Sequence, residues 1–212
     1  LFWFFIAIAQ MGFQPLFIRE VARNKSKANS FLMSGMFLMG LVSIFMSIIM
    51  VMFVHLFNYS PVIISATYFM GIALVLNMIN FVFQSIYMGY EKAEYVLIGM
   101  AFENGSKLLL GLIILFKGYG LIALSAVFAI SPLLGILLNI YLVTKNIFKP
   151  KLRIDWKLCK WILKVIPTFA GISFFSAFFI YMDVLFLSKL STMESLGFYS
   201  AAMRIVAMIK MI

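Results

Sequence analysis

The chain has 212 residues, of which 65% are hydrophobic and 11% are charged, and its formal net charge is +10. A soluble domain of this length could not cover its surface with so few polar residues, so composition excludes that class and favours a membrane protein. The apolar runs are long and continuous and do not alternate in ten-residue units. This pattern excludes a membrane β-barrel and predicts an all-α polytopic membrane protein.

Seven transmembrane segments are predicted in chain order. The 63 residues 28–90 contain no Asp, Glu, Lys or Arg, and as one helix they would extend roughly 95 Å, far beyond a bilayer core of about 30 Å. This stretch must therefore cross, turn at the polar, Pro-containing segment 55–61, and cross back. The predicted segments are about 1–18, 30–54, 62–88, 94–116, 119–143, 161–187 and 196–212. Because the chain begins and ends inside apolar runs, we interpret it as a fragment of a longer protein.

The distribution of Lys and Arg predicts the orientation. The loops at 19–29, 89–93 and 144–164 together hold twelve basic residues, whereas the alternate turns hold only Lys117 and Lys189. Loops rich in Lys and Arg face the cytoplasm, so these three loops are predicted to be cytoplasmic and the protein to be a multi-pass protein of the plasma (inner) membrane. Topology and attraction to anionic lipid explain the net charge, so no nucleic-acid partner is expected.

The long basic loop divides the chain into predicted lobes. We expect a first-lobe transmembrane bundle at 1–144, lacking its first helix, and the start of a second-lobe bundle at 161–212. The basic linker at 145–160 is expected to begin flexible around Pro150 and to turn amphipathic from Ile154. There, apolar residues recur at helical spacing, which predicts a helix lying on the cytoplasmic membrane surface.

Glu103 and Lys107 are the first candidate site. They lie four residues apart, about 40° around a helix, and Ser106 shares their face. Ionisable groups at bilayer depth are costly unless they are paired or reach a wet cavity. The pair is therefore predicted to line a cavity for a polar or anionic substrate, or to exchange a proton. The alternative is a self-neutralised pair that only seals against a neighbouring helix.

Two further groups of polar residues lie within predicted segments. Asn77, Asn80 and Gln84 fall within about 60° of one another on a helix, so they form either a hydrophilic stripe facing the same cavity or hydrogen bonds between helices. Asp183 and Arg204 lie on consecutive segments that would run antiparallel. They are predicted either to pair with each other or to line a second-lobe cavity.

The sequence shows no catalytic constellation. It contains no Gly-rich phosphate loop, no Ser/His/Asp set and no His cluster, and Cys159 is the single cysteine. We therefore expect a protein that is not an enzyme, with no cofactor and no metal site. Because no ATPase motif is present, transport would depend on an ion gradient or on the gradient of the substrate itself.

Several stretches resemble the polysaccharide-biosynthesis membrane proteins, the Wzx-type oligosaccharide flippases of the MATE/MOP superfamily. They read GFQPLFIREVAR at 12–23, YMGYEKAE at 87–94, KGYGLIAL at 117–124 and, following the segment 167–183, ESLGFYSAAMR at 194–204. Their order matches helices two to eight of that family. The resemblance implies a two-lobe, MOP-like helical-bundle transporter, of which this chain holds seven transmembrane segments.

The function implied by the resemblance is the flipping of polyprenyl-linked oligosaccharide to the outer leaflet by alternating access, for polysaccharide, lipopolysaccharide or O-antigen synthesis. Lys107 and Arg204 are hypothesised to contact the anionic head of this substrate. Glu103 and Asp183 would provide counter-charge or couple to H+ or Na+. Three alternatives stay open: a drug or cation antiporter or a flippase of another lipid, a polytopic membrane enzyme, and a structural assembly subunit.

Overall fold

The computed structural model describes the backbone of residues 1–10 and 12–209, and their side chains apart from several between 168 and 209. This described part is helical throughout, with short connections. Its elements are α1 (Phe2–Gln10), α2 (Phe13–Arg23), a 3-10 turn η1 (Lys25–Lys27), α3 (Ala28–Leu56), α4 (Pro61–Gly89), α5 (Ala93–Phe116), α6 (Leu121–Asn146), α7 (Trp156–Leu190) and α8 (Met193–Ile209).

Five helical stretches of the described residues are long and apolar enough to cross a membrane. They are Phe2–Arg23, Lys25–Leu56, Pro61–Gly89, Ala93–Phe116 and Leu121–Asn146. These stretches coincide with the first five predicted segments and confirm an all-α polytopic membrane protein. Helices α7 and α8 lie on the last two predicted segments, and their crossing of the membrane stays a prediction.

The first segment differs from its predicted form. Its helix breaks at Gly12, which has a left-handed φ of 70°, a conformation that glycine adopts without strain. Pro15 lies in the first turn of α2, where its missing N–H removes no helical hydrogen bond. The loop expected from residue 19 onward is also wrong, since α2 continues to Arg23. Its buried face, which includes Phe17 and Val21, explains this extension because α2 packs against α4.

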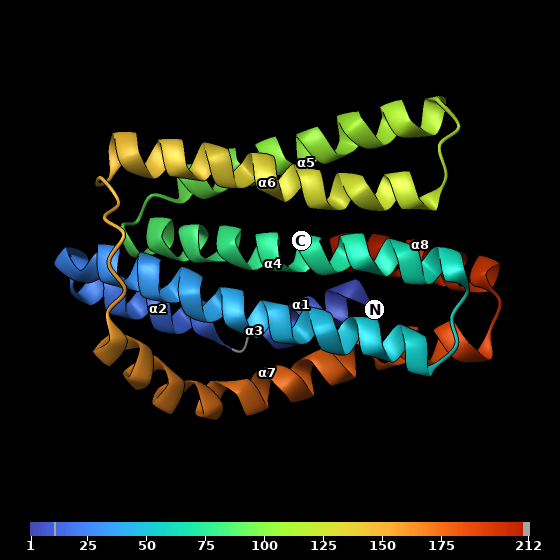
Figure 1. Ribbon diagram of the computed structural model, residues 1–212, viewed down its shortest axis with the longest axis horizontal. Helices are drawn as coiled ribbons and strands as arrows, with labels where there is room; N and C mark the ends of the chain where they lie inside the picture. The colour runs from blue at the N-terminus through green and yellow to red at the C-terminus, as the bar shows by residue number, and fades with distance from the viewer. Residues whose placement is uncertain (11, 210–212) are drawn as a thin grey trace.

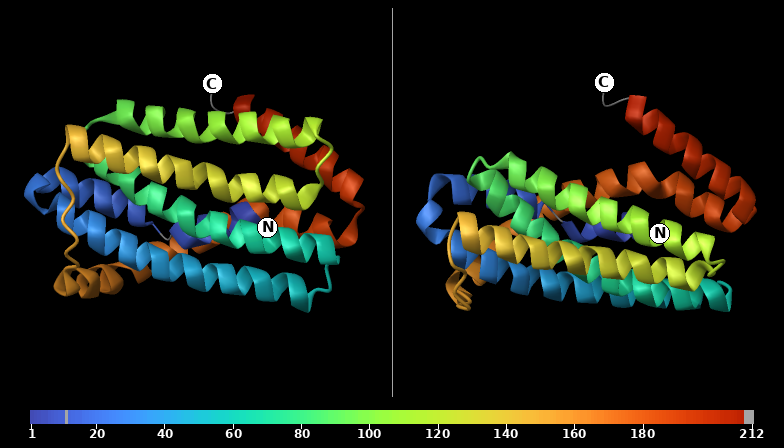
Figure 2. Two further views of the ribbon diagram at one scale, coloured as in Figure 1. Left: turned by 45° about the horizontal axis from the view of Figure 1, so that its top comes forward. Right: turned by 90° about the horizontal axis from the view of Figure 1, so that it is seen from above.

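Helix α4 lies at the centre of the bundle, with α5 and α6 on one side and α1 to α3 on the other (Figure 1). It contacts each of these five helices. Its buried positions, among them Leu74, Met78, Val82 and Phe83, lie on more than one side of the helix. Helix α7 runs along α1 and α3, and α8 leaves the bundle at an angle (Figure 2).

The three basic loops lie at the same end of the bundle (Figure 1). The Tyr90 hydroxyl donates a hydrogen bond of 3.1 Å to the Lys25 carbonyl, and the Lys92 ammonium donates one of 3.2 Å to the Asn146 carbonyl. Burial raises the pKa of the Tyr90 phenol, so it stays protonated as a donor. The loops are therefore held together by specific contacts. We call this the basic end.

The linker is held against α3 and does not hang free. The Asn29 side chain exchanges hydrogen bonds with the backbone N–H and carbonyl of Lys151, at 2.8 and 3.1 Å. The Ser34 hydroxyl does the same with the backbone of Asp155, at 3.1 and 3.5 Å. Asp155 in turn caps α7 by accepting from the N–H groups of Lys157 and Leu158. These contacts tie both ends of the segment 151–155 to α3, and the flexibility expected around Pro150 stays a prediction.

The predicted amphipathic helix forms the first turns of α7, which begins at Trp156 and continues to Leu190. Cys159, Ile162 and Ile166 are buried in the core, where α7 packs on α1 and α3, whereas Trp161 is exposed, so the placement of this segment on the membrane surface stays a prediction. Figure 2 shows the helix bending after these turns. The division into two lobes stays a prediction.

Candidate functional site

Glu103 and Lys107 form an ion pair in the middle of α5. The Lys107 ammonium lies 3.4 Å from Glu103 Oε1, and both side chains are largely shielded from the surroundings. Lys107 Nζ also lies 5.4 Å from the ring centroid of Phe128 on α6, within the range of a cation–π contact. Ser106 shares this face, but its hydroxyl donates to the Glu103 backbone carbonyl at 2.8 Å and does not reach the carboxylate.

Asn80 on α4 joins this pair to α6. Its side-chain nitrogen donates to Glu103 Oε2 at 3.2 Å and to the Pro132 carbonyl at 2.9 Å. Its side-chain oxygen accepts from Asn139 Nδ2 at 3.1 Å. These partners fix the orientation of the amide, since its nitrogen faces two acceptors and its oxygen faces a donor. Asn80 therefore connects α4, α5 and α6 through one buried side chain.

Asn139 and Tyr87 were missed by sequence reasoning. The Tyr87 hydroxyl donates to the backbone carbonyl and to Oδ1 of Asn139, both at 3.1 Å. Gly135 provides the space for this arrangement, because a Cβ there would lie 3.0 Å from Asn80 Nδ2 and 3.4 Å from Glu103 Oε2. The signal in the sequence was Asn139, the amide within the apolar part of α6. It lies one helical turn after Gly135 and two turns after Pro132, on the same face.

A cavity of about 190 Å³ opens beside this network, between α1, α4 and α5. All five residues of the first two predicted groups line it: Lys107, Glu103, Asn77, Asn80 and Gln84. Gln10 of α1 and Asn104 of α5 also line it and were not predicted. The Asn77 nitrogen donates to the Ala73 carbonyl of its own helix at 2.7 Å. Asn80 thus serves both alternatives, because it lines the cavity and bonds between helices.

Lys107 also borders a second hollow. This hollow measures about 310 Å³ and lies between α5 and α6, where Asn104 and Lys107 are joined by apolar residues such as Leu108, Leu112 and Phe128. The ammonium therefore lies on the boundary between a polar cavity and an apolar one. This position suits contact with an amphiphile, since a charged head and an apolar chain could be held on either side.

Asp183 on α7 accepts two hydrogen bonds from described residues. One of its carboxylate oxygens accepts from the Tyr199 hydroxyl of α8, and the other accepts from the Val184 backbone N–H. The contact shows that α7 and α8 are antiparallel neighbours at this depth. Arg204 belongs to α8, but its side chain lies outside the described residues, so its pairing and its role stay predictions.

The pair and its amides can exchange partners. A buried carboxylate needs a counter-charge or hydrogen-bond donors, and Glu103 has both in Lys107 and Asn80. If an anion binds the Lys107 ammonium, the Glu103 carboxylate still accepts a hydrogen bond from Asn80. If Glu103 takes a proton, the ammonium is released from its partner. The geometry therefore permits anion binding at Lys107 and protonation at Glu103 to assist each other.

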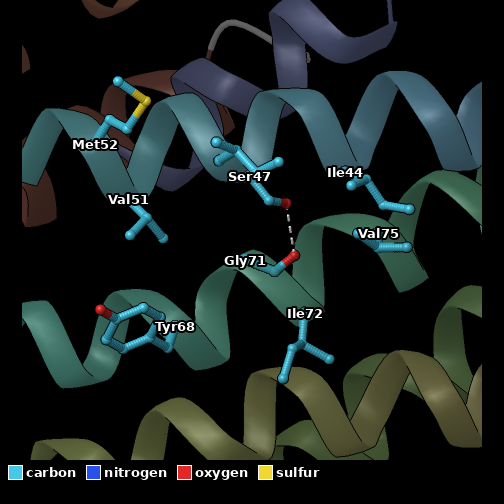
Figure 3. A pocket seen from close by; sticks show the side chains of 9 residues that line it. Ile44, Ser47, Val51, Met52, Tyr68, Gly71, Ile72 and Val75 are labelled. Atoms are coloured by element: carbon cyan, nitrogen blue, oxygen red, sulfur yellow. Dashed lines mark hydrogen bonds between the residues drawn. The ribbon is translucent and has the colours of Figure 1, made fainter.

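A larger groove of about 380 Å³ lies between α3 and α4 but has no Asp, Glu, Lys, Arg or His among its lining residues. In Figure 3 its walls are mostly aliphatic, and the Ser47 hydroxyl faces the Gly71 carbonyl at 2.9 Å. Ile44, Ile48 and Ile72 on its walls are exposed on the outside of the bundle. In a membrane this groove would contact lipid chains, so its size alone does not make it a polar site.

The family model described as polysaccharide biosynthesis protein matches residues 1–212, the whole chain. The chain belongs to this polysaccharide biosynthesis protein family. The family comprises Wzx-type flippases of the MOP superfamily, which confirms the resemblance. Comparisons with curated proteins and with solved structures returned no match.

Membership in the polysaccharide biosynthesis family supports a role in polysaccharide synthesis in a membrane. Members of the family are generally transporters or flippases and not enzymes, and the family implies a lipid-linked oligosaccharide as substrate.

Proposed function

We propose that this protein flips polyprenyl-linked oligosaccharide from the cytoplasmic to the outer leaflet of the plasma membrane by alternating access. One observation carries the proposal: a cation, Lys107, lies on the wall of a polar cavity inside the apolar bundle of a flippase family. Such a charge is costly in a membrane unless it has a partner or a function. Because its partner Glu103 lines the same cavity, the pair is accessible to a polar ligand.

The charge asymmetry supports the orientation assumed in this proposal. The stretches 19–29, 89–93 and 144–164 hold twelve Lys and Arg, against two in the alternate turns, so we place the basic end in the cytoplasm. Substrate assembled on a cytoplasmic carrier would then enter the cavity from that side. The substrate would leave when the second lobe, of which α7 and α8 are the proposed start, rocks against the first.

In this mechanism the anionic head of the substrate binds Lys107. The amides of Asn77, Gln84, Gln10 and Asn104 on the same cavity wall would bond sugar hydroxyls. The apolar lipid chain would remain outside the bundle in the bilayer. Asp183 and Arg204 would face the substrate from the second lobe in another state of the cycle.

Glu103 is the proposed coupling residue. When the substrate head binds Lys107, the Glu103 carboxylate loses its counter-charge and becomes available to a coupling cation, H+ or Na+. When the ion leaves, Glu103 attracts Lys107 again and the substrate head loses its partner. The exchange of partners would take place within the ion pair, whose charged atoms lie 3.4 Å apart. Substrate release would thus be linked to ion movement.

The test begins with deletion of the complete gene in its host. The readout is the accessibility of lipid-linked oligosaccharide to a glycosidase added outside. We expect accumulation on the inner face, rescued by the wild-type gene and by Lys117→Met, which removes a cation from the turn after α5. Lys107→Met should not rescue, although the protein is folded and present in the membrane. Normal outer exposure in the deletion strain would overturn the flippase proposal, and rescue by Lys107→Met would overturn the site.

A further inference from the structure

A cleft of about 830 Å³ lies at the basic end, between α2, η1 and α3 on one side and the first turns of α7 on the other. Its lining residues are Glu20, Arg23, Asn24, Lys27, Ser30, Phe31, Asp155, Lys157, Leu158 and Trp161. None of them lines the cavity at Glu103 and Lys107. The cleft is therefore separate from the proposed transport site.

The charges within the cleft leave three cations available. Glu20 lines the cleft and pairs at 2.9 Å with Arg19, which does not line it. Asp155 accepts from the N–H groups of Lys157 and Leu158 at 3.0 and 3.1 Å as the cap of α7. The described residues contain no acidic partner within ion-pair distance of Arg23, Lys27 or Lys157. All three are exposed, so the cleft presents net positive charge to an anion.

Both walls of the cleft are pre-formed. The α7 wall is fixed to α3 by the hydrogen bonds of Asn29 with Lys151 and of Ser34 with Asp155. On the other wall, the Asn24 side chain accepts from the N–H and hydroxyl of Ser26 and so shapes the η1 turn. Little conformational entropy would be lost in ordering these segments when a ligand binds, which favours binding.

Apolar side chains lie next to the cations. Phe31 lies in the first turn of α3, four residues after Lys27, and Trp161 follows Lys157 by one turn of α7. Each wall therefore changes from charged to apolar toward the bilayer. Phe31 is buried, Leu158 is partly buried and Trp161 is exposed. Tryptophan prefers the level of the lipid head groups. The cleft thus matches a molecule with an anionic head and an apolar chain that enters from the membrane.

We propose that this cleft binds the phosphate head group of an anionic membrane lipid, held by Arg23, Lys27 and Lys157, with an acyl chain against Leu158 and Trp161. Basic pockets between helices at the cytoplasmic surface have the chemistry to bind such lipids. The lipid would join α7 to α2 and α3 at the start of the proposed second lobe. It would act there as a bound structural lipid and not as the transported substrate.

The experiment measures lipid binding to the complete purified protein in a non-ionic detergent by native mass spectrometry. Phosphatidylglycerol is the anionic probe and phosphatidylcholine of the same acyl chains is the zwitterionic control. We expect the wild type to bind phosphatidylglycerol at least about tenfold more tightly. The double variant Lys27→Gln/Lys157→Gln should weaken that binding roughly tenfold to thirtyfold, by the contribution of two basic side chains. Lys27→Arg/Lys157→Arg should restore it.

The matched control is Lys149→Gln/Lys160→Gln, which removes the same charge from the basic end but outside the cleft and should change binding less than about twofold. An equal loss in both double variants would overturn the proposal, since attraction would then be diffuse. Equal binding of the two lipids by the wild type would also overturn it. Displacement of the lipid by an equal concentration of inorganic phosphate would show a phosphate site and contradict a lipid site.

The lipid proposal and the flippase proposal fail separately. Lys107→Met should leave phosphatidylglycerol binding unchanged, because Lys107 does not line the cleft. Loss of phosphatidylglycerol binding in Lys107→Met would place the lipid in the transport cavity and overturn the cleft proposal.

Discussion

The two hollows on either side of α4 show that chemistry, and not size, distinguishes a candidate site in a membrane bundle. The groove between α3 and α4 is twice as large, at about 380 Å³, as the cavity of about 190 Å³ beside α5. Its hydroxyl group at Ser47 is satisfied by the backbone of Gly71. The smaller cavity instead holds an ion pair and amides supported by α4, α5 and α6. In lipid an apolar groove costs little, whereas buried charge needs a dedicated set of partners.

The largest expected effect distinguishes the network from local polar contacts. Asn80→Leu should destabilise the protein by roughly 2–3 kcal/mol, because Glu103 and Asn139 both lose a buried partner. Asn77→Leu should cost less than about 1 kcal/mol, since among the described residues the Asn77 amide bonds only to Ala73 of its own helix. Unfolding in mixed detergent micelles measures both values. Equal losses would show that Asn80 does not join the helices.

The next effect concerns transport. Glu103→Gln keeps the shape and a hydrogen-bond acceptor for Asn80 but leaves Lys107 without its counter-charge. We expect transport to fall at least about tenfold, equivalent to roughly 1.4 kcal/mol of lost transition-state stabilisation, with the protein still folded. The glycosidase-accessibility assay measures it. Glu94→Gln, on the exposed start of α5, is the control, and unchanged transport in Glu103→Gln would contradict a coupling role.

A smaller effect tests how closely α6 approaches the ion pair. Gly135→Ala places a methyl group against Asn80 and Glu103, so we expect a loss of about 1–2 kcal/mol from displaced side chains. Gly105→Ala on α5 meets no atom within 4 Å and should be neutral or slightly stabilising. The same unfolding assay compares the two. A neutral Gly135→Ala would mean that the network relaxes without cost.

The smallest effect is expected in the α3–α4 groove. Ser47→Ala removes the hydroxyl contact to Gly71 and should cost about 0.6 kcal/mol, typical of a hydrogen bond between membrane helices. Transport should not change, because this groove lies outside the polar cavity. Loss of transport with normal stability would instead make this groove part of the transport path. That result would reverse the comparison between the two hollows.

Two kinds of feature were predictable from the residue pattern: the membrane spans, and the residues that share one face of a helix. Hydropathy determined five spans, because an apolar helix must match the thickness of the bilayer. Helical spacing alone placed Glu103 near Lys107 and put Asn77, Asn80 and Gln84 along one stripe. These relations arise within a single helix, so they do not depend on how the helices pack.

The partners that other helices contribute to the site became visible only once the helices were packed. Asn139 reaches Asn80 from 59 residues away on α6, and Tyr87 of α4 joins the network only through Asn139, 52 residues away. No periodicity along the chain predicts such partners. The start of α7 at Trp156 likewise depends on Asp155 capping it and on Ser34 of distant α3 holding that cap. Hydrogen bonds between elements depend on the packing of the whole bundle, so local sequence patterns cannot specify them.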